Sequence, residues 1–202
     1  SVALRKYRLS SLTPEKVKAE RKGSFSSVLL EGILEKWLRE NNRVSYHREE
    51  LPFKAGAISS AIQELKKVDF EGLGRESEKV YDLLILGKAF EQSVRGEVKS
   101  YTLRYVDFEN PERNVFHAAY EFEVTKRENE SRRRPDIVLF VNGIPFGVIE
   151  CKSDSKKVEQ AISQHLRNQQ EMEVPELYRF VQIALAVNRR DGSYGTAGTA
   201  KS

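Results

Sequence analysis

The chain has 202 residues, a net charge of +4, and a composition of 39% hydrophobic and 32% charged residues. This length suits one sizeable domain, and the composition is that of a soluble globular protein rather than a fibrous or disordered one. No apolar run approaches the roughly 18 residues that a membrane span needs, and no charged and then apolar leader opens the chain, so we expect a cytoplasmic protein. The single cysteine, Cys151, excludes an internal disulfide framework and agrees with a reducing compartment.

The N-terminal half of the chain predicts an arm followed by helices. Residues 1–23 are polar and basic, which favours a flexible basic arm. Apolar residues at intervals of three and four predict a helix over about residues 24–40, and the same spacing recurs through residues 57–65 and from Glu76 onward. We therefore expect a helical part over about residues 24–95.

From residue 100 onward the sequence favours strands. Segments rich in aromatic and β-branched residues alternate with turn-like segments, and a helical pattern with one apolar face interrupts them at about residues 155–172. The expected strands are residues 101–108, 115–124, 136–141, 144–152 and 178–187. This order predicts an α/β (α+β) fold, in which a central mixed β-sheet flanked by helices occupies about residues 100–190.

The last residues, 191–202, change abruptly to Gly, Ser, Thr and Ala. We expect a linker here, or the point at which a longer polypeptide was truncated, so that the globular domain covers residues 24–190. No phosphate-binding loop of the GxxxxGK[ST] type occurs in the sequence, so ATP would act only through domains absent from this chain.

Chemically informative residues lie on the two expected strands before the last helix. Thirteen residues separate Asp136 from Glu150, and Lys152 follows two positions later. Residues two apart on a strand project to the same face, so Glu150 and Lys152 point together, with the backbone carbonyl of Cys151 between them. Two carboxylates and a carbonyl are the hard oxygen ligands that suit Mg²⁺, and the ion would polarise a phosphodiester and activate a water. Lys152 would orient that water and screen the developing charge.

The register of the hairpin around Asn142-Gly143 tests this interpretation. An uninterrupted ladder with a two-residue turn would place Asp136 and Glu150 on opposite faces. A three-residue loop over residues 141–143 would bring them to the same face, within about 8 Å. We therefore predict an odd-numbered loop or a β-bulge. The alternative is that both carboxylates lie on the surface of an ordinary hairpin, but the apolar strand leading to Glu150 argues against it.

Basic residues flank this motif in the sequence. Arg132, Arg133 and Arg134 precede it, and Lys156 and Arg167 follow it. Positive charge on both sides is what a phosphate-handling surface requires, although charge runs are also common on solvated loops and helix faces. We take Arg134, Lys156 and Arg167 as candidate DNA-binding or site-supporting residues.

The histidines do not form a metal site in the sequence. His47, His117 and His165 are scattered and show no HExxH pairing. His165 falls on the apolar face of the predicted helix, so we expect a hydrogen-bonded core histidine rather than a ligand.

Residues 134–145, RPDIVLFVNGIP, and residues 148–152, VIECK, resemble the nuclease domain of the type I restriction enzyme R subunit, in the PD-(D/E)xK superfamily. The resemblance extends more loosely to residues 29–38 and 161–168, and so covers most of residues 25–195. It implies a restriction-endonuclease-like core around the Asp, Glu and Lys motif, with a helical N-terminal part.

The family also implies residues outside the central motif. A glutamine follows on the next helix, with a tyrosine four residues further on. Gln164 matches the glutamine and is expected to position substrate or support the site. Arg167 matches the basic residue beside that tyrosine, and Asn168 stands in the tyrosine's place, a departure that bears on how a DNA strand is engaged. Glu31, on the first helix, is a candidate for the family's early acidic residue, the alternative being a solvated helix position.

The resemblance further implies a function and partners. It implies Mg²⁺-dependent hydrolysis of DNA by the cleavage domain of an R subunit, which cuts without sequence specificity after ATP-driven translocation by absent motor domains. Methyltransferase and specificity subunits would complete the restriction–modification complex, and the isolated chain is expected to be weakly active or inactive. Two alternatives stay open: a catalytically silent nucleic-acid-binding or coupling module, and another PD-(D/E)xK enzyme such as a junction resolvase or repair nuclease. The intact Asp, Glu and Lys set favours an enzyme.

Overall fold

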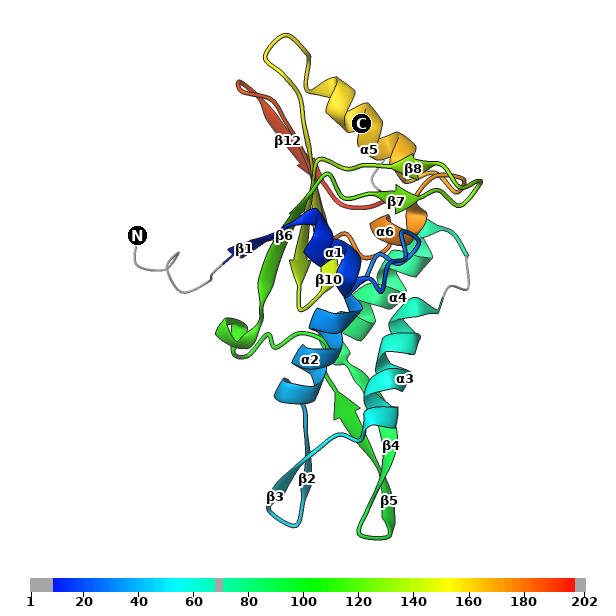
Figure 1. Ribbon diagram of the computed structural model, residues 1–202, viewed down its shortest axis with the longest axis vertical. Coiled ribbons are helices and arrows are strands. Elements are labelled where there is room, and N and C mark those ends of the chain that lie inside the picture. The colour runs from blue at the N-terminus through cyan, green and yellow to red at the C-terminus, as the bar shows by residue number, and fades with distance from the viewer. Residues whose placement is uncertain (1–8, 68–70, 199–202) are drawn as a thin grey trace.

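Six strands form the central sheet, in the order β1-β6-β9-β10-β11-β12 (Figure 1). The computed structural model describes residues 9–67 and 71–198. The strands are β1 (Leu9–Leu12), β6 (Phe116–Tyr120), β9 (Ile137–Val141), β10 (Ile144–Cys151), β11 (Ile183–Val187) and β12 (Gly192–Gly195). β1 runs parallel to β6 and β10 parallel to β11, whereas the other neighbouring pairs are antiparallel. The expected central mixed sheet is confirmed.

The two faces of this sheet differ in burial. Val138 and Val148 point to one face and are fully buried, whereas Ile137 and Ile149 point to the other face and are only half-buried. Because side chains alternate along a strand, Glu150 shares the buried face with Val148. The helix α5 (Glu159–Asn168) packs on β10 and β11. A charged side chain at position 150 therefore enters the interior beneath a helix.

The N-terminal segment is folded from residue 9 onward, contrary to the flexible arm expected over residues 1–23. β1 pairs with β6, and α1 (Pro14–Glu20) is capped by Thr13, whose hydroxyl accepts a hydrogen bond from the backbone N–H of Lys16. The Arg21 side chain is buried and donates to three backbone carbonyls. Basic composition predicted an exposed arm, but here a basic side chain satisfies buried main-chain oxygens. Residues 1–8 lie outside the described residues.

Three helices and two hairpins form the rest of the N-terminal part. They are α2 (Glu31–Asn41), β2 (Arg43–Tyr46), β3 (Glu49–Pro52), α3 (Ala55–Lys66), α4 (Leu73–Leu86), β4 (Lys88–Val94) and β5 (Glu97–Leu103). The predicted helices are confirmed, although their limits differ from those expected. The two hairpins, which project from the lower end in Figure 1, were not predicted. The helical part does not reach residue 95, because Gly87 (φ 73°) ends α4 and β4 follows at once.

The remaining elements are the 3₁₀ turn η2 (Pro111–Arg113), β7 (Val124–Thr125), β8 (Arg132–Arg133) and α6 (Pro175–Tyr178). The strand expected over residues 115–124 is divided into β6 and β7 at Glu121, which has a positive φ of 49°. The expected linker is partly wrong, since β12 pairs with β11 as an edge strand; residues 199–202 lie outside the described residues. None of the described helices combines the length and the apolar character that a membrane crossing would need.

Candidate active site at the end of the β9–β10 hairpin

The register of the β9–β10 hairpin places Asp136 opposite Glu150. The turn has two residues, Asn142 and Gly143, both with positive φ (52° and 84°), and Val141 pairs with Ile144. The ladder then shifts by one residue between Pro145 and Gly147, so that Ile137 pairs with Ile149. The predicted β-bulge is confirmed, while the three-residue loop considered beside it is wrong. The shift moves Glu150 to the face of the sheet on which Asp136 lies.

Glycines make both features of this hairpin possible. A Cβ atom at Gly143 would lie 2.5 Å from the carbonyl oxygen of Leu30, and the Gly143 carbonyl accepts the Leu30 N–H at 2.9 Å. A Cβ at Gly147, just after the bulge, would meet Ile183 and Leu139 at 3.3 Å. A side chain at Gly143 would therefore force the turn away from α2, whereas one at Gly147 would require small shifts of the Ile183 and Leu139 side chains.

Four predicted residues meet at this end of the sheet. Asp136 Oδ2 accepts a hydrogen bond from the backbone N–H of Cys151 at 2.7 Å. Gln164, on α5, donates from Nε2 to Glu150 Oε2 at 2.5 Å and accepts from Lys152 Nζ at 2.7 Å. The amide of Gln164 thus joins the carboxylate to the ammonium group and fixes both side chains relative to α5.

Glu150 is the electrostatically unusual member of this group. Its side chain is fully buried, and its Oε1 atom has no hydrogen-bond partner among the described residues. Burial, and then the neighbouring charge of Asp136, raise the pKa of Glu150 to about 8, although Lys152 and Arg167 act in the opposite direction. A positive charge placed between the two carboxylates would offset the repulsion from Asp136 and oppose the effect of burial.

The oxygen atoms available here define a candidate metal-ligand set. Within residues 9–67 and 71–198, no group of three His, Cys, Asp or Glu side chains is arranged to hold a metal ion. The candidates are the carboxylates of Asp136 and Glu150 with the backbone carbonyl of Cys151, as the sequence predicts. Such hard oxygen ligands, few in number and open to added waters, are those that Mg²⁺ accepts in proteins.

The arginines before Asp136 are engaged by acidic residues. Arg132 Nη1 lies 2.7 Å from Glu123 Oε2, Arg133 forms a two-point ion pair with Glu173, and Arg134 Nη2 lies 3.6 Å from Glu121 Oε1. The run of positive charge read from the sequence is therefore largely neutralised. Of the three, the Arg134 pair is the most exposed and the longest, so its guanidinium is the easiest to recruit to another anion.

The two other candidate residues, Lys156 and Arg167, are both exposed. Lys156 is exposed in the loop between β10 and α5. Arg167 is exposed on α5 and donates to the side chain of Asn168, which is buried. Their binding of DNA stays a prediction.

Glu31 does not join the site. It is buried, not solvated, and its carboxylate pairs with Lys66 at 2.8 Å and Lys22 at 3.4 Å. α2 begins beside the Gly143 turn, whereas Glu150 lies at the other end of β10, six residues and about 20 Å further along the strand. Glu31 therefore stabilises the start of α2.

Behind the site, His165 attaches α5 to the rest of the fold. Its Nδ1 lies 2.8 Å from the hydroxyl of Tyr178, and its Nε2 lies 2.9 Å from the carbonyl oxygen of Leu185 on β11. The expected core histidine is confirmed. Tyr178 was missed as its partner, because residues 178–187 were expected to form one apolar strand and the short helix α6, which begins at Pro175, was not predicted.

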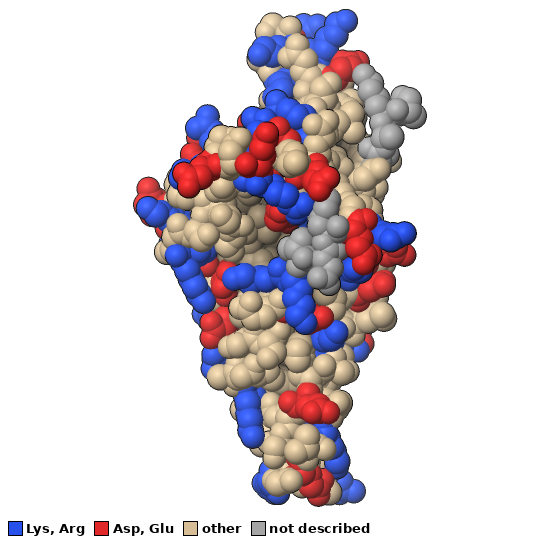
Figure 2. Space-filling view, turned by 90° about the vertical axis from the view of Figure 1, so that its right-hand side faces the viewer, with Lys and Arg blue, Asp and Glu red and all other residues tan. Residues whose placement is uncertain are grey.

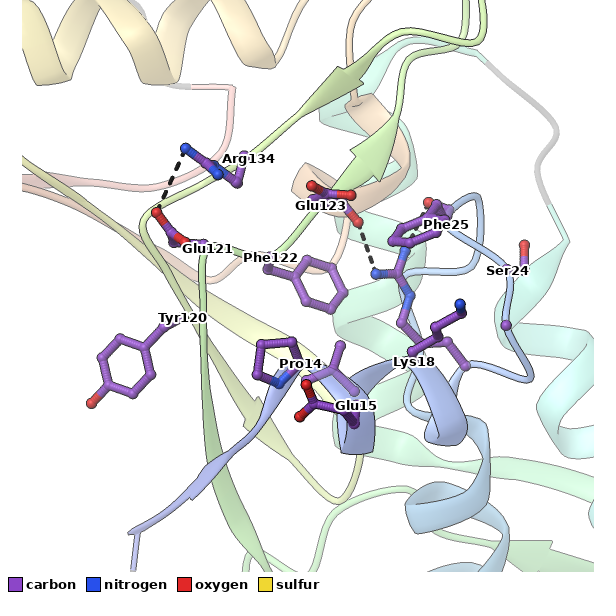
Figure 3. Close-up of a pocket in the computed structure, with 13 residues that line it drawn as sticks. Pro14, Glu15, Lys18, Ser24, Phe25, Tyr120, Glu121, Phe122, Glu123 and Arg134 are labelled. Carbon is purple, nitrogen blue, oxygen red and sulfur yellow. Dashed lines mark hydrogen bonds and ion pairs between the residues drawn. The ribbon is translucent and has the colours of Figure 1, made fainter.

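A cavity of about 450 Å³ opens on the β1 side of the site (Figure 3). Its wall is continuous with the motif, since the N–H groups of Glu121 and Phe122 donate to the carbonyls of Asp136 and Pro135. Lys18 and Arg134 line it together with acidic residues: Glu15, Glu121 and Glu123. This mixture of charges does not favour an anion, and the chemistry described above does not use the cavity.

A mixed sheet with flanking helices, carrying Asp, Glu and Lys at adjoining strand ends, defines a nuclease-like α+β fold. The family described as the type I restriction enzyme R protein N terminus matches residues 6–202. The chain belongs to this family.

Relatives of known name agree with this membership. The "Putative type I restriction enzyme MjaIXP endonuclease subunit" of Methanocaldococcus jannaschii is 31% identical over 190 residues, which cover 93% of this chain and 17% of the relative. The MjaVIIIP endonuclease subunit of the same organism, also named as putative, is 31% identical over 80% of this chain and 15% of its own length. The type I restriction enzyme HindI endonuclease subunit of Haemophilus influenzae is 32% identical over 71% of this chain and 13% of its own length. The chain thus spans less than a fifth of each relative.

Proposed function

We propose that this chain is the Mg²⁺-dependent DNA-cleaving domain of a type I restriction enzyme R subunit. The observation that carries the proposal is the convergence of Asp136, Glu150, Lys152 and Gln164 at one end of the β9–β10 hairpin. The names of the relatives, all endonuclease subunits, support a nuclease role in general.

The donor set fits a divalent cation. Asp136 and Glu150 would hold it together with the Cys151 carbonyl, and the buried Glu150 Oε1, which has no partner among the described residues, is an atom ready to serve as a ligand. When bound, Mg²⁺ supplies Lewis-acid polarisation of the phosphodiester and a more acidic water. Two close carboxylates beside a cation retain their negative charge, so the pair would ionise fully at neutral pH.

Lys152 supplies a fixed positive charge next to these carboxylates. Gln164 holds its Nζ by accepting one of its three N–H bonds, which leaves two donors for a water or for phosphate oxygens. In this position the ammonium group orients the attacking water and stabilises the negative charge that develops on the phosphate oxygens. Gln164 does not react; it fixes the relative positions of Lys152 and Glu150.

The wider context is part of the same proposal. We propose that the remainder of the R subunit supplies ATP-driven translocation, and that methyltransferase and specificity subunits supply modification and target recognition. In that arrangement this domain cuts DNA without reading sequence, because the chemistry of its Asp, Glu and Lys side chains addresses the phosphodiester and not the bases.

A plasmid-nicking assay tests the proposal. The 202-residue chain, alone and within the complete R subunit, is incubated with supercoiled plasmid with and without Mg²⁺. We expect nicking that requires Mg²⁺ and is lost in Asp136→Ala and Lys152→Ala. Asp82→Ala and Lys36→Ala, which remove exposed residues of the same types from α4 and α2, should nick like wild type. If wild type nicks no faster than the site variants in either setting, the chain is a catalytically silent binding module instead.

A further inference from the structure

Two turns lie side by side where the chain leaves the strands of the proposed site. One is the loop from β10 to α5, residues 152–158, and the other is the turn from β11 to β12, residues 188–191. Cys151 pairs with Val187, and the N–H of Lys152 donates to the Val187 carbonyl at 2.9 Å. The second turn therefore starts directly beside Lys152, one strand spacing of about 4.8 Å away.

The second turn is held in a fixed conformation by Asn188. Its side-chain oxygen accepts the N–H groups of Arg190 and Asp191 at 2.8 and 2.7 Å, and its side-chain nitrogen donates to the carbonyl of Lys156 at 3.1 Å. One side chain thus closes the turn and attaches it to the first loop. The basic residues of the two segments are held together as a single surface.

This surface carries four exposed basic side chains: Lys156, Lys157, Arg189 and Arg190. We call these four residues the basic tip. In Figure 2 most of the charged side chains at the upper end of the molecule, which these two turns form, are Lys and Arg, although the turns also carry the exposed Asp154 and Asp191. The distal end, formed by the β2–β3 and β4–β5 hairpins, shows both signs of charge.

The basic tip differs from the arginines that precede Asp136. The side chain of Arg189 is 84% exposed, and one of its nitrogens lies 3.3 Å from Asp154 Oδ2, which leaves its other donors free to turn outward. Within residues 9–67 and 71–198, the Arg190 guanidinium has no hydrogen-bond or ion-pair partner. By contrast, Arg133 makes two short hydrogen bonds to a largely buried Glu173. Charge available to an external anion therefore lies at the basic tip.

We propose that the basic tip binds the DNA backbone at phosphates adjoining the one that is cut, with Arg189 and Arg190 as the main contacts. The inference rests on the proposed nuclease function, since it takes the cut phosphate to lie at Lys152. Each DNA strand presents a phosphate for about every 3.4 Å of helix axis, so a duplex engaged at Lys152 places neighbouring phosphates within reach of a turn that begins beside it. Guanidinium groups match phosphate geometry through paired N–H donors. Such contacts hold the duplex in register and carry no sequence preference.

Binding of a fluorescent duplex of about 30 base pairs tests the proposal by anisotropy over a series of salt concentrations. The measurement uses the 202-residue chain in EDTA, where cleavage does not interfere, and is repeated with Ca²⁺. We expect Arg189→Ala combined with Arg190→Ala to weaken binding roughly tenfold at moderate salt. The slope of log K against log salt should fall by about 2, one unit for each lost phosphate contact. Arg189→Lys with Arg190→Lys should retain most of the slope.

A matched control separates local contacts from net charge. Arg48→Ala combined with Arg95→Ala removes the same charge from two exposed turn arginines at the distal hairpins, and it should bind DNA like wild type. The proposal is overturned if both double variants weaken binding equally, if neither does, or if wild type binds no DNA in either buffer. Plasmid nicking separates the two ideas. If Arg189→Ala with Arg190→Ala binds DNA like wild type while Mg²⁺-dependent nicking is retained, only the proposed role of the basic tip is wrong. If DNA binding depends on the basic tip but no Mg²⁺-dependent nicking occurs, only the proposed nuclease function is wrong.

Discussion

Two buried glutamates at opposite ends of the β9–β10 hairpin have opposite electrostatic surroundings. Glu31, beside the turn, is 6% exposed, and Glu150, at the far end, is 0% exposed. Burial alone would raise the pKa of Glu31, but the hydrogen bond and charge of Lys66, with help from Lys22 and Ser27, lower it below its usual range. Burial and Asp136 together raise the pKa of Glu150 to about 8.

The difference in partners indicates a separate role for each of the two carboxylates. Glu31 receives cations and a hydroxyl from its own chain, so its charge is satisfied within the fold. Glu150 receives one hydrogen bond from Gln164, a second carboxylate as its neighbour, and no partner for Oε1 among the described residues. Folding gains nothing from such a group, because an isolated buried charge is costly. We therefore propose that Glu150 serves a bound cation, whereas Glu31 stabilises the fold.

Neutralising each glutamate in turn is the most direct test of the separate roles assigned to Glu150 and Glu31. Glu150→Gln should lower Mg²⁺-dependent nicking by more than about 100-fold, since it removes a proposed metal ligand. Mg²⁺ at about 100 times its dissociation constant should raise the Tm of wild type by about 5–10 °C and leave that of Glu150→Gln unchanged. Differential scanning calorimetry with and without Mg²⁺ measures the second effect independently of catalysis.

Glu31→Gln should show the reverse behaviour. It leaves Lys66 and Lys22 without their acid, but both lysines are partly exposed, so the loss in unfolding free energy should be about 1 kcal/mol. Nicking and the Mg²⁺ effect on Tm should be unchanged. A Glu31→Gln protein that no longer responds to Mg²⁺ would show that the division between the two glutamates is wrong.

A smaller effect is expected from the residue that links Glu150 to Lys152. Gln164→Ala should reduce nicking about 10- to 100-fold, because the carboxylate and the ammonium group lose the amide that orients them. Gln164→Glu would test the geometry further, since it keeps an acceptor for Lys152 but faces Glu150 with a second acid. Gln160→Ala, an exposed glutamine one turn earlier on α5, is the matched control and should behave like wild type. Equal activity of both alanine variants would remove Gln164 from the site.

The sequence predicts the motif well because strand periodicity constrains it. The requirement that Asp136 and Glu150 share a face is enough to demand an irregular hairpin, and the bulge between Pro145 and Gly147 supplies it. Asn142-Gly143 is a dipeptide that favours a two-residue turn with positive φ at both positions, so the sequence favours the bulge over the longer loop. The position of the bulge, between Pro145 and Gly147, could not be read from the sequence.

Features that depend on tertiary partners were not predictable from composition. Residues 9–21 read as a polar arm, yet Arg21 fills a buried position because three main-chain carbonyls converge on it. Arg132 to Arg134 read as a positive surface, but they pair with Glu121 and Glu123, which precede them by about ten residues, and with the more distant Glu173. The turn at residues 188–191 lies in a segment with no motif, and only the pairing of β10 with β11 brings its arginines to the site.

His165 is a third buried titratable residue. It differs from Glu150 because it lies near the site yet has both ring nitrogens hydrogen-bonded within the chain. Burial lowers the pKa of His165, so the folded protein holds it neutral between Tyr178 and Leu185. The unfolded chain takes up a proton near pH 6.5, and the folded state does so only at lower pH. The stability that His165 contributes is therefore present above about pH 6.5 and is lost as the pH falls through the lower folded pKa.

Melting curves at pH 7.5 and 5.5 should show a larger loss of Tm for wild type than for His165→Gln. The exposed-histidine variant His47→Gln should follow wild type. An equal loss of Tm in all three proteins would mean that His165 takes up its proton without opening the contact between α5 and β11.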